Sequence, residues 1–302
     1  MIMVRGLGSI LLLVATSFAP QELPSGSLPF FYDLYTFRSA EGGTTVVAAI
    51  AVPVRRLRRE RENRQFRYRF DMRFVLADTA RGSVVNVMDS VFVSTPAPLG
   101  RQHLLHTHVE IQAPPSGATQ QRVIVTDAAR PGVGQLYHSP YPIPDYSGSE
   151  LMLSDIAFGL PDATGGWSRG DVTLALLPTS QFPESAFDVY YEIYNLPTGT
   201  PYETEVSIQP VDDSDEERTE GDGRVRTIFT GESEASEDGS VSELRRVESS
   251  LPKGRYRLTV TVRDATNGST ARSSKVVQVQ GWGRGATMVP AMPYSVRPLG
   301  GR

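Results

Sequence analysis

The sequence predicts an all-β fold of two tandem antiparallel β-sandwich domains, for three reasons. Large apolar residues alternate with polar ones most clearly between residues 66 and 76, and a period of two with one polar face is typical of an antiparallel strand. Similar runs, separated by turn residues, recur at the density expected of a sandwich. After residue 19, no segment of ten or more residues has helical periodicity.

The first 19 residues have the features of a secretory signal peptide. Arg5 precedes an apolar run from Gly6 to Ala15, which is too short to span a bilayer, and small residues follow at Ser17 and Ala19. We therefore expect an exported protein, in the periplasm, on the outer surface or outside the cell, with no transmembrane span in the mature chain. The alternatives are an uncleaved anchor and a buried first strand.

The chain contains no cysteine, and its formal net charge is −4. Without cysteine it carries neither a disulfide nor the lipid-modified cysteine of a lipoprotein, so its domains depend on their hydrophobic cores. A mature chain of roughly 280 residues is long enough for two such cores. Because acidic and basic residues are interleaved, no nucleic-acid partner is expected.

The first predicted domain covers residues 30–130. Its six predicted strands cover residues 30–37, 45–54, 66–76, 84–93, 104–111 and 122–126. A short turn around Arg56–Asn63 is the helical candidate between them. Residues 131–147 are rich in proline and glycine and lack periodicity, so they are predicted to be a linker.

The second predicted domain covers residues 148–281. Its predicted strands cover residues 151–158, 172–177, 187–196, 203–209, 225–230 and 241–247, followed by a closing hairpin. Residues 282–302 are rich in glycine and proline and are predicted to be a flexible C-terminal tail.

The closing hairpin gives the most specific structural prediction. Its lead-in, residues 251–256, has the pattern Leu-x-x-Gly-x-Tyr, which resembles the tyrosine corner of immunoglobulin-like sandwiches. We therefore expect Tyr256 to hydrogen-bond to upstream backbone, and the second domain to be immunoglobulin- or fibronectin-III-like. Asn267 and Gly268 stand between two alternating runs, which predicts a two-residue type I′ turn with positive φ at both positions.

Short strand motifs at residues 153–157, 189–196 and 251–258 resemble the β-rich region of bacterial secreted proteins of the GWxTD-domain type. The resemblance covers about residues 150–280. The motif for which the family is named is absent, because neither Trp167 nor Trp282 precedes Thr-Asp. The resemblance implies a sandwich scaffold in a cell-envelope setting, and the family has no established activity to transfer.

Three of the four histidines lie within residues 103–108. If Leu105, Val109 and their alternate neighbours face the core, His106, His108 and Glu110 share the opposite face. Side chains two apart on a strand point the same way, so His106 and His108 are candidate metal ligands that need a further ligand from elsewhere. The alternative is a solvated polar face.

Two clusters of charged residues are candidate binding sites. Acidic side chains at alternate positions, among them Asp213 and Asp215, offer oxygen ligands for Ca²⁺, although their spacing does not fit an EF-hand and solvated loops are the alternative. Arginines such as Arg58 and Arg61 lie between two predicted strands, where they could bind an acidic partner, an anionic lipid or a glycan. They could equally meet the acidic loops of the second domain, or form a solvated hairpin tip.

Tyrosines in the predicted strand 187–196 form a further candidate site. On the alternation, Tyr190, Glu192 and Tyr194 share one face, opposite Val189 and Tyr191. If exposed, Tyr190 and Tyr194 would form an aromatic strip suited to sugar stacking or a protein contact. The alternative is that they pack beneath a neighbouring strand, a loop or the other domain.

No catalytic motif is found in the sequence. We therefore expect no cofactor, and a non-enzymatic interaction or structural module of the bacterial cell envelope whose partner is an envelope protein or a glycan. Two alternatives remain: a metal-assisted hydrolase whose site includes His106 and His108, and a Ca²⁺-stabilised adhesion-type domain.

Overall fold

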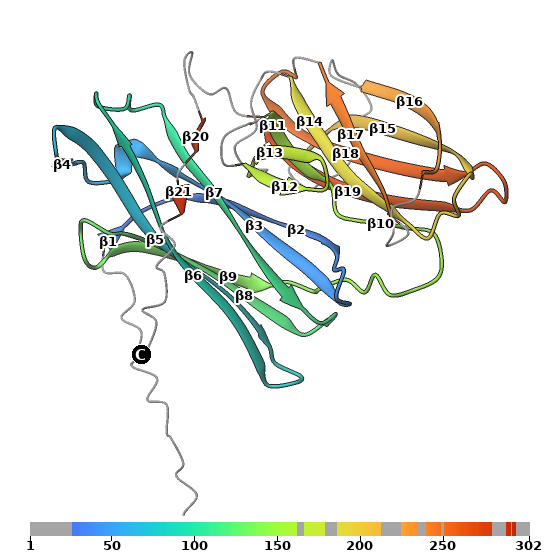
Figure 1. The fold of residues 1–302 in the computed structure, drawn as a ribbon, viewed down its shortest axis with the longest axis horizontal. Helices are drawn as coiled ribbons and strands as arrows, with labels where there is room; N and C mark the ends of the chain where they lie inside the picture. Colours follow the sequence, from blue (N-terminus) through green and yellow to red (C-terminus); the bar gives the residue numbers. More distant parts are fainter. Residues whose placement is uncertain are drawn as a thin grey trace, which may run out of the picture.

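The computed structural model describes residues 26–161, 166–178, 186–212, 225–234, 240–248, 251–279, 288–290 and 292–293. The predicted signal peptide lies outside them. Within them the fold is all-β, with a single 3₁₀ turn, η1 (Val54–Arg56), and the strands form four sheets (Figure 1). No helix in this part of the chain is long and apolar enough to cross a membrane.

The first and second sheets are built mainly from the N-terminal half of the chain. The first sheet has the strand order β1-β9-β8-β5-β6-β21, with β4 also paired to β5: β1 (Gly26–Ser27), β4 (Glu60–Glu62), β5 (Gln65–Asp78), β6 (Ser83–Thr95), β8 (Thr119–Asp127), β9 (Val133–Pro140) and β21 (Met292–Pro293). The second sheet has the order β2-β3-β7-β20: β2 (Phe31–Arg38), β3 (Thr44–Pro53), β7 (Leu104–Ala113) and β20 (Met288–Pro290).

The third and fourth sheets are built from the C-terminal half. The third has the order β10-β14-β11-β13-β12, with β17 also paired to β14: β10 (Met152–Leu153), β11 (Ala157–Pro161), β12 (Trp167–Arg169), β13 (Val172–Leu176), β14 (Phe187–Tyr194) and β17 (Ser240–Val247). The fourth has the order β16-β15-β18-β19: β15 (Pro201–Val211), β16 (Val225–Glu232), β18 (Gly254–Asp264) and β19 (Thr270–Val279).

Most strand pairs are antiparallel, and the first two sheets pack face to face as a sandwich. The alternation in β5 is confirmed: Tyr68, Phe70, Met72, Phe74 and Leu76 are all buried in the first core. This core lies between the first and second sheets, where each inward-facing side chain loses its contact with water.

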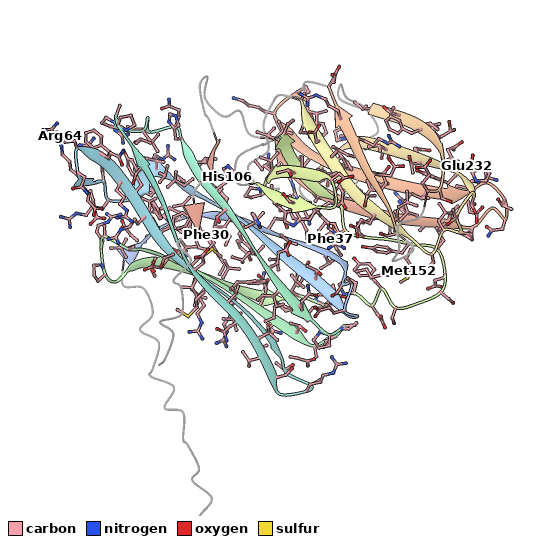
Figure 2. The ribbon with its side chains drawn as sticks, in the orientation of Figure 1. Phe30, Phe37, Arg64, His106, Met152 and Glu232 are labelled. Carbon is pink, nitrogen blue, oxygen red and sulfur yellow. The ribbon has the colours of Figure 1, made fainter. Side chains whose placement is uncertain are left out.

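Strand β3 is buried along its whole length because sheets cover both of its faces. Val46 and Ala48 pack in the first core, whereas Val47 and Ala49 pack in a second core with residues of the third and fourth sheets. A continuous apolar run is the pattern of a strand covered on both sides. We call the contact between the second and third sheets the joint, and Phe37 of β2 lies in it (Figure 2).

The predicted linker and the predicted flexible tail both contain strands, so neither segment is irregular throughout as predicted. The predicted linker 131–147 begins with β9, which pairs along its length with β8 and extends the first sheet to Pro140. The predicted flexible tail 282–302 contains β20 and β21, which pair with β7 and β6. The C-terminal part of the chain therefore returns to the first two sheets.

Two turn predictions are also corrected. The hairpin β18–β19 is present, but residues 265–269 connect its strands, and only Gly268 of the predicted pair has positive φ, at 76°. The Asp264 carboxylate accepts hydrogen bonds from the backbone N–H groups of Thr266 (2.7 Å) and Asn267 (3.4 Å), and so fixes this longer loop.

The helical candidate 56–63 is wrong, since η1 ends at Arg56 and β4 occupies Glu60–Glu62. The two-residue turn with positive φ at both positions lies here instead. Asn63 (49°) and Arg64 (64°) connect β4 to β5, and their neighbours Glu62 and Gln65 are paired.

Tyr256 makes the hydrogen bond that the tyrosine-corner pattern predicts. Its hydroxyl donates to the backbone carbonyl of Pro252 at 2.9 Å, and its ring is buried in the second core. The immunoglobulin- or fibronectin-III-like topology of the second unit remains a prediction, which this contact supports.

Replacing Tyr256 with phenylalanine is expected to lower the free energy of unfolding by about 1 kcal/mol, because only the buried hydroxyl bond is lost. Replacement with alanine, which also empties the ring's volume, is expected to cost about 3 kcal/mol. Urea unfolding followed by circular dichroism measures both. An unchanged stability in the phenylalanine variant would show that the hydroxyl has no structural role.

Candidate functional site

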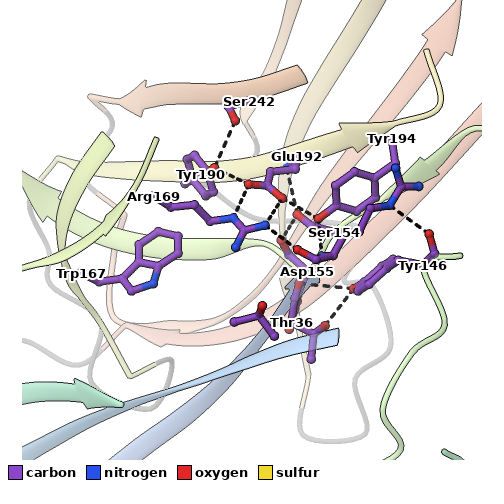
Figure 3. A network of polar contacts seen from close by, with 12 residues as sticks. Thr36, Tyr146, Ser154, Asp155, Trp167, Arg169, Tyr190, Glu192, Tyr194 and Ser242 are labelled. Carbon is purple, nitrogen blue, oxygen red and sulfur yellow. Dashed lines mark hydrogen bonds and ion pairs between the residues drawn. The ribbon is translucent and has the colours of Figure 1, made fainter. Parts of the chain in front are cut away.

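The predicted aromatic strip is not on the surface. Tyr190 and Tyr194 are both 0% exposed, which contradicts their assignment as exposed binding residues. The prediction that they share a face with Glu192 is confirmed, but that face packs in the joint against the second sheet (Figure 3). Every residue of β14 is buried, because the fourth sheet covers its other face.

Glu192 is the centre of a buried polar network in the joint. Its carboxylate is paired with the Arg169 guanidinium, whose Nη2 lies 2.9 Å from Oε2, and accepts hydrogen bonds from the hydroxyls of Tyr190 (2.7 Å) and Tyr194 (2.6 Å). The backbone N–H of Arg38, from β2, donates to the Tyr194 hydroxyl at 2.8 Å. The network therefore links the second sheet to the third.

The hydroxyls and the guanidinium of this network have raised pKa values, so they keep their protons and are not suited to react. Burial raises the pKa of Tyr190 and Tyr194, and the adjacent Glu192 carboxylate raises both further. Burial opposes the charge on Arg169, but its ion pair with Glu192 outweighs that effect and raises the pKa of Arg169. The hydroxyls therefore remain donors and the guanidinium remains charged.

A second charged cluster joins three of the four sheets. The Lys275 ammonium of β19 lies 3.0 Å from the Asp155 carboxylate, 3.4 Å from that of Asp33, and donates to the Leu34 carbonyl at 2.7 Å. Burial lowers the pKa of Lys275, but the two carboxylates raise it by more, so that the amine stays protonated. A protonated amine is not a nucleophile, and this cluster also acts as a structural tie.

The histidine strand does not form the predicted metal site. Leu105 and Val109 face the first core as predicted, and the opposite face of β7 points towards the joint. Glu110 accepts a hydrogen bond from the Trp167 indole at 2.6 Å, and burial lowers the pKa of His108. No group of three or more His, Asp or Glu side chains within the described ranges could hold a metal ion, so a hydrolase site at His106 and His108 gains no support.

The predicted calcium ligands Asp213 and Asp215 lie outside the described residues. The predicted basic residues Arg58 and Arg61 are exposed, on either side of the start of β4. Strand β4 lies at the end of the first sheet that is far from the third and fourth sheets (Figure 1).

A groove on the open side of the first sandwich was not predicted. It lies beside β2, an edge strand of the second sheet, and β9, the neighbour of the short edge strand β1 in the first, and its volume is about 490 Å³. We call it the Tyr32 groove. The residues that give it its chemical character are Phe30, Tyr32, Asp33, Gln121, Tyr137 and Tyr141.

Aromatic rings form one wall of the Tyr32 groove. Tyr32 and Tyr137 are half-buried and stacked, with ring centroids 5.6 Å apart and planes inclined by 26°. Phe30 packs edge-on against Tyr137 at 5.0 Å. Because each ring is held by another, the wall is preorganised for a flat ligand.

Gln121, which lines the same groove, has a buried polar atom without a partner. Its side chain is 4% exposed, and its amide N–H₂ donates to the hydroxyls of Tyr32 and Ser139, each at 2.8 Å. Its Oε1 atom has no hydrogen-bond partner. A buried acceptor without a donor costs about 1–3 kcal/mol, and a bound hydroxyl or amide would remove that cost.

Sequence reasoning missed this groove because its parts come from distant strands. Tyr32 lies in one predicted strand, Gln121 immediately precedes another, and Tyr137 falls in the segment predicted to be a linker. The one available signal was Gln121, a polar residue in phase with the apolar Val123 and Val125 of the same strand.

Comparisons with known proteins leave the family open. No protein-family model matches the sequence, and no curated protein matches it. Among solved structures, red sea bream transglutaminase is similar over 82% of this chain and 31% of its own, with a TM-score of 0.23 and 9% identity. A calcium-binding mutant of Bacteroides uniformis β-glucuronidase 2 is similar over 82% and 28%, with a TM-score of 0.27 and 10% identity. This chain thus spans less than a third of either neighbour.

Proposed function

We propose that the protein is an exported, non-enzymatic binding module of the bacterial cell envelope, and that the Tyr32 groove binds a glycan. The observation that carries the proposal is the unpartnered Oε1 of Gln121 in a groove walled by stacked aromatic rings. A sugar has a partner for each feature. Hydroxyl groups at its edge can donate to Oε1, and its flat C–H face can pack against the aromatic rings.

The size and charge of the groove agree with this ligand class. About 490 Å³ falls within the range of small-ligand sites. The Asp33 carboxylate at its end is paired with Lys275, so the groove offers no uncompensated charge to attract an ion. The charged groups of the joint are likewise paired with one another, which supports a binding function over catalysis.

A glycan array tests the proposal, with peptidoglycan fragments and other bacterial envelope glycans as probes. The wild-type protein is expected to bind at least one of them, and Tyr137→Ala and Gln121→Leu are each expected to weaken that binding about tenfold, which corresponds to ~1.4 kcal/mol. Phe229→Ala removes a half-buried ring from the second unit and is the matched control, which should bind as the wild type does.

Two results would contradict the proposal. In the first, the control variant loses as much glycan binding as Tyr137→Ala. In the second, no glycan binds, while wild-type protein captures an envelope protein that Tyr137→Ala does not, which would assign the groove to a protein partner.

A further inference from the structure

Positive charge is concentrated in one short segment of this acidic chain. Residues 55–73 contain nine arginines, no lysine and three acidic residues, a formal charge of +6. Since the whole chain carries −4, the remaining residues carry −10. The segment folds as the hairpin β4–β5 and continues along the outer face of the first sheet.

Few of these charges are neutralised within the described part of the chain. Glu62 lies 2.6 Å from Arg67 and Glu60 lies 3.0 Å from Arg69. The more exposed arginines of the segment, which have no carboxylate within ion-pair distance in the described ranges, are Arg55, Arg56, Arg58, Arg59, Arg61 and Arg64. Figure 2 places Arg64 at the opposite end of the molecule from Glu232 of the second unit.

The hairpin holds some of its arginines in fixed positions. The guanidinium groups of Arg59 and Arg61 lie 5.0 and 5.8 Å from the ring centroid of Phe66. The left-handed turn at Asn63 and Arg64 sets where the tip projects. Arginines that are already ordered lose less entropy when they bind a ligand.

A cavity of about 320 Å³ lies next to the hairpin on the outer face of the first sheet. Arg67, Arg69, Asp71 and Phe92 line it, and the Arg67 guanidinium lies 4.6 Å from the Phe92 ring centroid. The Asp71 carboxylate accepts a hydrogen bond from the Ser90 hydroxyl at 2.6 Å. The Nε atom of Arg67 is buried and has no hydrogen-bond partner. An anionic oxygen bound in the cavity would accept that hydrogen bond and strengthen it by its charge.

We propose that this basic end of the first sheet binds an acidic polysaccharide, with Arg61 on the Phe66 side of the sheet, Arg67 and Arg69 on its outer side, and Arg58 and Arg64 exposed beside them. Guanidinium groups bind carboxylate, sulfate and phosphate oxygens through paired hydrogen bonds. Arg67 and Arg69 are two residues apart on β5, roughly 7 Å, so the outer face of the first sheet presents their two positive charges in a row. Such a row suits a polymer. The Phe92 ring on the outer side of the cavity gives a sugar ring an apolar surface.

A bilayer fits this basic end of the sheet less well than a polysaccharide does. Peripheral membrane binding usually adds inserted apolar side chains to basic charge. The large apolar side chains that are well exposed among the described residues are Val84, Met88, Ile228 and Leu244, and none of them lies in the hairpin. A cavity is also a poor match for a flat surface of headgroups.

Salt-gradient elution from immobilised alginate tests the proposal. The wild-type protein is expected to elute later from alginate than from the neutral agarose support. The double variant Arg61→Gln/Arg64→Gln is expected to elute at lower salt and to bind soluble alginate about tenfold more weakly at low salt. Arg263→Gln/Arg272→Gln makes the same change in net charge on exposed residues of the second unit, and should elute as the wild type does.

Two further probes separate the polysaccharide from other polyanions. Polyglutamate presents carboxylates without sugar rings, and vesicles with 30% phosphatidylglycerol present anionic headgroups; both are expected to bind more weakly than alginate. The proposal is overturned if alginate retains the protein no better than agarose, or if the control pair loses retention equally. It is also overturned if polyglutamate or the vesicles bind at least as well. Tyr137→Ala is expected to leave alginate binding unchanged, which separates this site from the Tyr32 groove.

Discussion

Replacing Trp167 with alanine is expected to lower the free energy of unfolding by about 3–5 kcal/mol, among the largest effects of any single substitution in this protein. The Trp167 ring is fully buried in the joint, stacked on Phe37 with centroids 5.2 Å apart and edge-on to Tyr190 at 5.3 Å. Removing it leaves a cavity between the second and third sheets and takes the hydrogen-bond donor away from Glu110.

Urea unfolding by far-ultraviolet circular dichroism measures this effect; fluorescence is unsuitable because Trp167 is one of only two tryptophans. Trp167→Phe keeps a ring against Phe37 and Tyr190 but lacks the indole N–H, and is expected to cost clearly less than alanine. A loss below about 1.5 kcal/mol for alanine would mean that the joint contributes little to the stability of the fold.

Replacing Glu192 with leucine is expected to cost about 3 kcal/mol or more, because it leaves the Arg169 charge without its partner and two tyrosine hydroxyls without their acceptor. The Glu192 side chain is 3% exposed and that of Arg169 is 22% exposed. Water reaches part of the guanidinium, which places the expected loss at the lower end of the range for broken buried ion pairs.

A double-mutant cycle separates the ion pair from the cavity. Arg169→Met/Glu192→Leu removes both charges and is expected to be more stable than Glu192→Leu alone. The exposed pair Arg226–Glu205, at 2.7 Å, is the matched control: Glu205→Leu should change stability by less than about 1 kcal/mol. Equal costs at the two sites would show that burial adds nothing to the Glu192 contacts.

The strands were largely predictable because the alternation of apolar and polar residues follows directly from the geometry of a strand. In β5, every second residue is apolar, and the structure buries those residues in the first core. In β14, the same reasoning correctly placed Tyr190, Glu192 and Tyr194 on one face. Alternation reports which side chains point together, because that follows from the local backbone.

Alternation does not report what covers a face, and the candidate site was missed for that reason. The sequence left open whether Tyr190, Glu192 and Tyr194 face solvent or pack beneath another element. In the structure they satisfy one another and Arg169 beneath the second sheet. The sequence feature that indicated a strand covered on both faces was the unbroken apolar run of β3. The Tyr32 groove depends on which strand edges meet, and no local pattern contains that information.

The return of the chain to β7 has a consequence for how the protein folds as it is synthesised. Val289 of β20 pairs with Leu105, so one edge of the second sheet stays open until more than 180 further residues have been made. An open edge can pair with a strand from another chain, which makes the nascent protein prone to aggregation during that interval.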